Sequence, residues 1–253
     1  MLLAIDVGNT QTVIGLFTDG QLVDHWRIAT VAERTSDELA LAFEQLLAVS
    51  GHEDVEVEGI AICSGVPRVT AELRSMAQRY FDLVPLVIEP GVKTGMPILY
   101  ENPKEVGADR IANAVGAFDR FGGPAIVVDF GTANTIDAVS ANGEYLGGAI
   151  FPGIEVSLDA LFGRAAGLRR VELVAPKNVI GKTTAEAIQS GAVYGFSGQV
   201  DALVTKFIEE LGPSTVVATG GLAELIAPTS TTIQCVDPWI TLHGLQLIYE
   251  RNR

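Results

Sequence analysis

Residues 2–12 read LLAIDVGNTQT, and residues 126–135 read IVVDFGTANT. In both stretches a short apolar run, typical of a buried β-strand, leads to an Asp and then to a Gly two positions on. Asp6 and Asp129 therefore occupy equivalent places, 123 residues apart. A chain that repeats one strand and turn at about half its length is expected to consist of two similar halves.

The residues of this doubled turn favour an anionic ligand. Gly8 and Gly131 let the main chain approach a ligand closely, because glycine has no Cβ. Successive backbone N–H groups in such a turn form an anion-binding concavity, and the Asp carboxylate can hold a metal ion or its water beside phosphate oxygens. Either turn alone is more simply a plain hairpin. The pair, in which Thr12 also matches Thr135, indicates that a polyphosphate is held from two sides.

Short signals predict the other elements of the first half. Asp19-Gly20 is typical of a hairpin turn between two strands. Thr35, followed by Glu38, is expected to form a capping box at the start of a helix, and Pro67 is well placed to open a second helix. The predicted order is three strands, a helix, a strand, a helix and a strand.

The second half repeats this order. Its strands are expected over residues 125–131, 135–141 and 144–153, its helices over 156–167 and 183–212, and alternating strands and helices over 215–252. Strands that alternate with helices predict sheets covered by helices. We therefore expect an α/β fold of two halves, residues 1–123 and 124–253, each a mixed sheet with helices, with a ligand cleft between them.

The composition narrows the class of protein. Of 253 residues, 48% are hydrophobic and 19% are charged, as in a globular chain with a sizeable core. No apolar run approaches the roughly 20 residues of a membrane helix, and the start lacks the basic residues of a signal peptide. A net charge of −14 disfavours nucleic acid and acidic membranes as partners. We expect a cytoplasmic protein in which an anion such as ATP needs backbone donors, a few cations and a divalent metal.

Two further patterns are expected to carry no chemistry. Cys63 and Cys235 lie in short apolar runs without a CxxC or a nearby His, so we expect buried small residues and neither a disulfide nor a zinc site. Residues 176–184, PKNVIGKTT, nearly match a phosphate-binding P-loop. Pro176 stands at the position of the first Gly and has no N–H to donate, which argues against that function.

Two halves with an Asp-x-Gly turn in each resemble the superfamily of actin, the sugar kinases and the Hsp70 ATPases, whose halves are ribonuclease-H-like. Residues 217–225, VATGGLAEL, resemble the adenosine-binding segment of that superfamily. Five further stretches in order resemble the type III pantothenate kinases: IDVGNT at 5–10, ENPKEVGADR at 101–110, DFGTANT at 129–135, GGAIFPGI at 147–154 and IGKTTAEAIQSG at 180–191. The resemblance covers essentially the whole chain.

This resemblance implies ATP-dependent phosphorylation of pantothenate to 4'-phosphopantothenate, the first step of coenzyme A biosynthesis. It also implies ATP, Mg²⁺ and a monovalent cation (K⁺ or NH₄⁺) as cofactors, a nucleotide cleft between the halves, and a homodimer. Two alternatives stay open: another small-molecule kinase of the superfamily, and a non-catalytic nucleotide-binding regulator. The presence of Asp6, Asp109, Arg110 and Asp129 argues against a site that has lost its activity.

Asp109 is the candidate catalytic base, because phosphoryl transfer needs a base near the attacking hydroxyl. It lies where a loop enters a predicted helix, so helix capping is the alternative role. Arg110 is a cation suited to the carboxylate of pantothenate, with a surface ion pair as the alternative. The resemblance places the following residues around the acceptor: Tyr100, Gly107, Ala108, Asp109, Arg110 and Thr184. Tyr100 could equally be a core aromatic residue.

The nucleotide site follows from the two turns and the resemblance. The residues expected to bind ATP are Asp6, Val7, Gly8, Asn9, Thr10, Gln11, Thr12, Val13 and Thr132. Asp129 is expected to bind the monovalent cation, and Asp6 to hold Mg²⁺ through water. The chain departs from the usual pattern of the family at Asn134, Ile136 and Thr183, and none of these removes a residue assigned to chemistry.

A stripe of small residues marks the predicted helix 183–212. Ala187, Gly191 and Gly195 recur at steps of four, so another helix could approach this face closely. Packing within the chain would explain the stripe, and so would a second copy of the chain. The resemblance favours the second explanation and hence a dimer seam.

Overall fold

The computed structural model describes residues 1–253. The chain divides into two compact units: the first comprises Met1–Pro97, Glu101–Gly116 and Ile240–Arg253, and the second comprises Ile98–Tyr100 and Ala117–Trp239. The expected division at residues 123 and 124 is linear, whereas these units are not, because the chain returns to the first unit at its C-terminal end. No helix is long and apolar enough to cross a membrane.

The first unit contains a mixed sheet of five strands in the order β3-β2-β1-β4-β5. The strands are β1 (Leu2–Val7), β2 (Gln11–Thr18), β3 (Gln21–Ala29), β4 (Gly59–Ser64) and β5 (Leu86–Val87). The first three are antiparallel neighbours, and β4 runs parallel to β1. The predicted hairpin is confirmed, since Asp19 and Gly20 both have a positive φ. The last strand predicted for this half is reduced to the two residues of β5.

The second unit repeats this arrangement in the order β10-β9-β6-β7-β8. Its strands are β6 (Ala125–Phe130), β7 (Ala133–Val139), β8 (Tyr145–Pro152), β9 (Thr215–Thr219) and β10 (Cys235–Val236). In each unit the first strand lies at the centre, with its two antiparallel successors on one side and the two parallel strands on the other. The expected α/β fold with two mixed sheets is confirmed.

The two central turns differ in length, which corrects one detail of the sequence comparison. Val7 pairs with Thr12 across the first turn, whereas Phe130 pairs with Asn134 across the second. The second turn is therefore one residue shorter, and the counterpart of Thr12 is Asn134 rather than Thr135. The Asn134 side chain is fully buried, and neither of its amide atoms has a hydrogen-bond partner. Such a group costs about 1–3 kcal/mol of stability.

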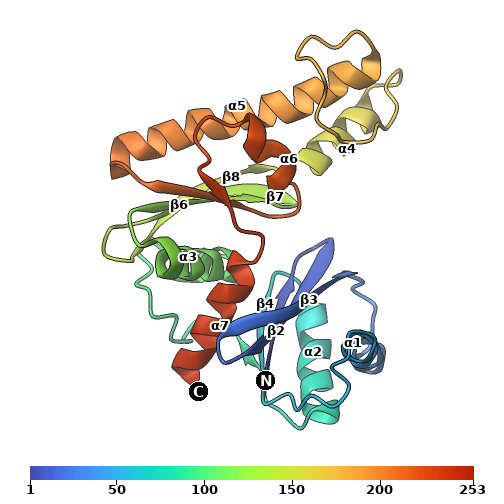
Figure 1. Ribbon diagram of the computed structural model, residues 1–253, viewed down its shortest axis with the longest axis vertical. Helices are drawn as coiled ribbons and strands as arrows, with labels where there is room; N and C mark the ends of the chain where they lie inside the picture. Colours follow the sequence, from blue (N-terminus) through green and yellow to red (C-terminus); the bar gives the residue numbers. More distant parts are fainter. The chain divides into compact units, whose positions relative to one another are not determined.

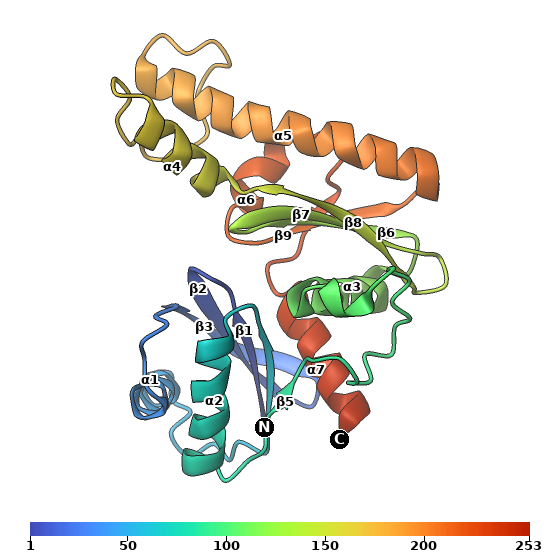
Figure 2. The same cartoon turned by 180° about the vertical axis from the view of Figure 1, so that it is seen from behind.

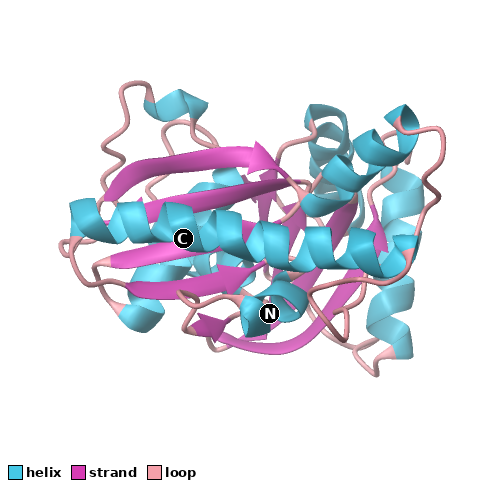
Figure 3. Cartoon of the chain, turned by 90° about the horizontal axis from the view of Figure 1, so that it is seen from above, coloured by secondary structure: helices cyan, strands magenta, loops and turns pink.

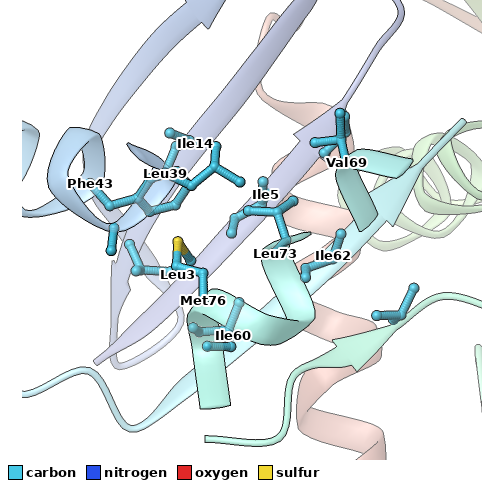
Figure 4. Packing of buried hydrophobic residues seen from close by; sticks show 14 of the residues in the cluster. Leu3, Ile5, Ile14, Leu39, Phe43, Ile60, Ile62, Val69, Leu73 and Met76 are labelled. Atoms are coloured by element: carbon cyan, nitrogen blue, oxygen red, sulfur yellow. The ribbon is translucent and has the colours of Figure 1, made fainter. Parts of the chain in front are cut away.

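The helices α1 (Ser36–Val49) and α2 (Pro67–Tyr80) cover one face of the first sheet, and α7 (Ile240–Asn252) contacts its central strand (Figure 1). Alternate residues of the strands point into the core beneath α1 and α2, where Leu3, Ile5 and Ile14 pack with Phe43 and Leu73 (Figure 4). The predicted capping box of Thr35 and Glu38 and the predicted start of α2 at Pro67 are confirmed.

The long helix α5 (Thr184–Leu211) lies along one face of the second sheet (Figures 2 and 3). Its buried side chains, among them Val193 and Val200, pack on Ile126 and Val128 of β6. The predicted helix over 183–212 is confirmed, with Thr183 as the N-cap and Gly212 at φ 87° after its end. Two shorter helices complete this unit, α4 (Ile154–Arg164) and α6 (Ala223–Ile226).

Residues 165–183, between α4 and α5, contain no helix or strand. Three side chains of α5 tie this connecting segment to the helix. The Gln189 amide donates to the Glu172 carbonyl, the Ser190 hydroxyl donates to the Val179 carbonyl, and the Glu186 carboxylate accepts from the N–H groups of Lys182 and Thr183. The side chain of Ile180 is 82% exposed.

The helix α3 (Ala108–Phe121) begins in the first unit, where it crosses α7 at very short range. A Cβ at Gly244 would collide with the main chain of Ala112, and one at Gly116 would collide with the main chain of Ile240. The Thr241 hydroxyl donates to the Asn113 side-chain oxygen at 2.6 Å in the same crossing. The start of α3 is thus held against α7 by backbone contact.

Candidate active site

The first turn connects β1 to β2 through Gly8, Asn9, Thr10 and Gln11. The Gly8 N–H donates to the Gln11 carbonyl at 3.0 Å, and a Cβ on Gly8 would lie 3.0 Å from the same oxygen. The side chains of Asn9, Thr10 and Gln11 are exposed. The turn is therefore tight at its Gly and presents polar groups to solvent, as an anion-binding loop requires.

Thr30, which follows β3, holds this turn in place. Its N–H donates to the Thr10 carbonyl at 3.0 Å, and its hydroxyl donates to the Gly8 carbonyl at 2.8 Å. The hydroxyls of Thr30 and Thr12 lie 2.9 Å apart. Sequence reasoning missed Thr30, although a Thr at the end of the third strand of the repeat was visible. Thr12 is 4% exposed, so its side chain helps to hold the turn from below.

Asp6 is the last residue but one of β1 and is partly buried beside the turn. Burial raises the pKa of Asp6 to about 6, and a hydrogen bond from the Cys63 thiol opposes this rise. The negative charge of Asp109 raises the pKa of Asp6 further. The two carboxyl groups, from β1 and from the start of α3, are thus within electrostatic range of each other in the first unit.

Asp109 occupies the first turn of α3 and is exposed. Its Oδ1 accepts a hydrogen bond from the Arg110 N–H at 2.9 Å. Gly107 precedes the helix, and a Cβ there would collide with the Asp109 carboxylate. Because Asp109 lies inside the helix, it does not act as an N-cap, although its charge at the N-terminal end favours the helix dipole.

Arg110 is 6% exposed. Its side chain is therefore not a surface group. Ala108, the first residue of α3, is partly buried beside it. Asp6 and Asp109 of the predicted site thus lie in one unit and influence each other electrostatically, and the shared site itself stays a prediction.

The second turn is packed from two sides by glycines. A Cβ at Gly220, whose φ is +90°, would collide with the Asp129 carboxylate and the Phe130 carbonyl. A Cβ at Gly153 would collide with the carbonyls of Gly131 and Thr132, and the Gly153 N–H donates to the Thr132 carbonyl at 3.1 Å. The main chain thus approaches Asp129 and the turn more closely than any other residue type allows.

Tyr100 belongs to the second unit and packs on Tyr145 of β8, with ring centroids 6.4 Å apart. The ring of Tyr100 is partly buried, and the Tyr145 hydroxyl donates to Asp137 at 2.7 Å. Asp137 is fully buried and also accepts from the Thr135 hydroxyl at 3.1 Å. Tyr100 thus packs on a tyrosine whose hydroxyl is bonded to the buried Asp137. Its ring is partly buried, so Tyr100 is neither a fully buried core residue nor a surface residue.

Thr184 is the first residue of α5 and is exposed. Thr183, which replaces the Asn usual in the resembled family, caps this helix and forms a capping box with Glu186. No strand leads directly into residues 176–184, as it would in a P-loop, and Lys182 is exposed. The prediction that this stretch is not a P-loop is therefore confirmed.

The side chains of this chain form no metal site with three or more His, Cys, Asp or Glu ligands. Both cysteines are free, Cys63 buried and Cys235 only partly buried. A Mg²⁺ ion in proteins commonly keeps several waters and binds one or two carboxylates together with substrate phosphates. Asp6 fits that mode, because it lies beside the first turn with one carboxylate oxygen that makes no hydrogen bond within the chain.

Two mixed sheets with the same strand order, each with an Asp-x-Gly turn after its central strand, define the fold of the actin-like ATPases and sugar kinases. An inorganic polyphosphate/ATP-glucomannokinase from Arthrobacter has this fold, with a TM-score of 0.53 at 13% identity over 100% of this chain and 99% of that one. A conserved Campylobacter jejuni protein assigned to the Baf family of transcriptional activators has a TM-score of 0.60 at 19% identity. The match covers 99% of this chain and 98% of that one.

The family is shown by the sequence. The pattern that defines type III pantothenate kinases matches residues 2–206. The type III pantothenate kinase of Streptomyces griseus is 57% identical over 261 residues, with 100% of this chain and 98% of that protein covered. That of Moorella thermoacetica is 54% identical over 253 residues, with 100% of both covered. The chain belongs to the type III pantothenate kinase family.

Proposed function

We propose that this chain transfers the γ-phosphoryl group of ATP to the primary hydroxyl of pantothenate, giving 4'-phosphopantothenate for coenzyme A synthesis. Identity of 57% to a type III pantothenate kinase over the whole chain supports the activity. The observation that carries it at the level of chemistry is that Asp109 and Asp6 are close enough in one unit for their charges to interact. One carboxylate serves the acceptor hydroxyl, and the other serves the metal and phosphates.

Asp109 is the proposed base. It is exposed at the start of α3, so an acceptor can reach it, and Gly107 leaves room beside its carboxylate. A base must come within roughly 2.6–3.2 Å of the hydroxyl whose proton it takes. Removal of that proton as the phosphorus–oxygen bond forms is the one step of phosphoryl transfer that needs a side chain with a free lone pair.

The nucleotide is proposed to bind the first turn, through the residues from Asp6 to Val13, and Thr132 of the second turn. The exposed side chains of Asn9 and Gln11 support this role, since both can donate to phosphate oxygens. Mg²⁺ would be held by Asp6 through water, and it would neutralise charge on the phosphates when bound. Asp129, which the glycines pack closely, is the proposed ligand of K⁺ or NH₄⁺.

The acceptor is proposed to contact Gly107, Ala108, Arg110, Tyr100 and Thr184. The guanidinium of Arg110 is buried, so its charge is little screened and can bind a carboxylate strongly. Tyr100 and Thr184 offer hydroxyl groups from the second unit. A site built from such groups should reject acceptors that lack matching polar atoms, because its own groups would be left unpaired.

A coupled ATPase assay with Mg²⁺ and K⁺ tests this proposal. Turnover should rise sharply with pantothenate and stay near background with glucose or glycerol. It should fall when Na⁺ replaces K⁺, and Arg110→Ala should weaken pantothenate use more than ATP binding. Stimulation by a sugar alone would favour another kinase of the superfamily. ATP binding without stimulation by any acceptor would favour a regulator, and equal rates in Na⁺ and K⁺ would remove the role of Asp129.

A homodimer is proposed to form along α5. Ala187, Gly191 and Gly195 are exposed, and a Cβ added at either Gly would meet no atom within 4 Å. The open space at these two glycines supports a second copy of the chain as the partner of this face. The side chain of Ile180, in the segment that leads into α5, is 82% exposed and would gain from burial. The expected cytoplasmic location stays a prediction.

A further inference from the structure

Cys63 lies beside Asp6 on the next strand of the first sheet. Strand β4 runs parallel to β1, and Cys63 is the register partner of Asp6. Partners in register point to the same face of a sheet, so the two side chains are neighbours. The Cys63 sulfur lies 3.1 Å from Asp6 Oδ1, and its side chain is fully buried.

No other group in the chain donates a hydrogen bond to the Asp6 carboxylate. On the opposite side its register partner is Val13, which is apolar. The earlier residues of this face, Ala4 and Ala61, are small, fully buried and apolar. The direction of the Asp6 carboxylate therefore depends on one contact, the S–H group of Cys63.

We propose that Cys63 is a positioning residue for the kinase reaction. Its thiol fixes Asp6 Oδ1, so that Oδ2 is available to hydrated Mg²⁺ and, through it, to the phosphates of ATP. This role rests on the proposed function, because it assigns Asp6 to the metal. A cysteine that the sequence marks only as a small buried residue thus sets the orientation of the metal-binding carboxylate.

The chemistry of the position predicts which substitutions preserve this role. A hydroxyl donates to a carboxylate more strongly than a thiol does, so serine keeps the contact. Alanine removes the donor and leaves space, and valine removes the donor but fills the space. If Cys63 mattered only for packing, valine would be tolerated better than serine, because a buried hydroxyl is costly and a methyl group is not.

The test compares Cys63→Ser, Cys63→Ala and Cys63→Val, with Cys235→Ser as the matched control in the other unit. Titration calorimetry gives the affinity for ATP with Mg²⁺ and with EDTA, and urea unfolding gives the stability of each variant. We expect Cys63→Ala and Cys63→Val to weaken Mg·ATP binding about fivefold to tenfold, the effect of losing one ordinary hydrogen bond, because a thiol is a weak donor. Binding of ATP in EDTA and the KM for pantothenate should be unchanged, whereas kcat should fall.

Cys63→Ser should restore Mg·ATP affinity to within about twofold of the unchanged protein, since the donor is kept. Wild-type affinity in the two apolar variants would overturn the proposal, and so would affinities that follow the order of stability instead of the presence of a donor. These outcomes are read from binding alone. Failure of the kinase assay in the unchanged protein would therefore count against the proposed function, while the ranking of the variants still decides the role of Cys63.

Discussion

At the scale of single residues, the buried carboxylate of Asp6 lowers the stability of the folded chain at neutral pH. Its pKa in the folded chain is about 6, against 3.8 ordinarily, because burial disfavours the charged form. The folded chain thus binds this proton more tightly than the unfolded chain does. Stability from this group is greatest below pH 3.8 and is lost as the pH rises through 6, so the charged carboxylate destabilises the fold at neutral pH.

Asp6→Asn should therefore stabilise the protein at pH 8 in buffer without metal or nucleotide. The expected gain in free energy of unfolding is about 1–3 kcal/mol, which reflects a pKa shift of about two units. The gain should shrink as the pH falls toward 4. Urea unfolding at both pH values measures it, with the exposed Asp54→Asn as a control that should change little at either pH. A destabilised Asp6→Asn variant at pH 8 would contradict the effect of burial.

Asp109→Asn addresses the proposed base. The amide has almost the same shape and still accepts the Arg110 N–H bond, so the fold and nucleotide affinity should be retained. Turnover should fall by roughly 10²–10⁴, the usual range for a general acid–base group. Steady-state kinetics with pantothenate, beside calorimetry with Mg·ATP, separates the two effects. Near-normal turnover would leave Asp109 with only its role at the start of α3.

Individual residues could be predicted where the signal is local. The capping residue Thr35, the hairpin at Asp19 and Asp6 itself follow from neighbours a few positions away. Thr30 and Cys63 could not be found in this way. Their partners, at Gly8 and at Asp6, lie 22 and 57 positions away, and only the register of the strands brings them together.

At the scale of elements, the crossing of α3 and α7 requires glycine at Gly116 and Gly244, because the two main chains approach too closely for a Cβ. Gly244→Ala should lower the free energy of unfolding by about 1–3 kcal/mol or more, because its Cβ overlaps backbone that cannot move aside. It should also lower kcat, since α3 carries Asp109. Denaturant unfolding and steady-state kinetics measure the two effects.

The matched control is Gly198→Ala, an exposed position in α5 where an added Cβ meets no atom within 4 Å. Alanine favours helix over glycine, so this variant should gain about 0.5–1 kcal/mol. If both variants were stabilised by the same amount, the crossing would tolerate more space than its geometry indicates.

Most strands and helices could be predicted, because their periodicity and caps are local. The length of the second turn could not. Both turns share the Asp-x-Gly pattern and a later Thr, so the two stretches align without a gap in the sequence. Only the pairing of Phe130 with Asn134 shows that one residue is missing from the second turn.

At the scale of the whole molecule, the repeat predicted two similar sheets, and the strand order of both is the same. The return of the C-terminal segment to the first unit was not predictable. A terminal amphipathic helix can cover either sheet equally well by composition. Close backbone contacts at Gly116 and Gly244, which are far apart in sequence, hold α7 in the first unit.

The proposed dimer predicts a mass of twice 26.8 kDa by light scattering at micromolar concentration. Gly195→Glu should shift this toward the single chain and weaken association at least about tenfold, because a buried charge at a close helix contact is costly. A Cβ at this exposed position meets no atom of its own chain within 4 Å, so folding should be unaffected. Gln78→Glu makes an equal change of charge at an exposed position of α2, and it should leave the mass unchanged. A single-chain mass for the unchanged protein would contradict the dimer.

The connecting segment 165–183 would then have a stability that depends on protein concentration. In one chain it has no regular structure, and Val174, Val179 and Ile180 remain exposed. A second copy that covers these side chains would suppress local opening by mass action. Dilution below the dissociation constant should therefore make this segment the first place where a protease cuts, while both sheets remain resistant.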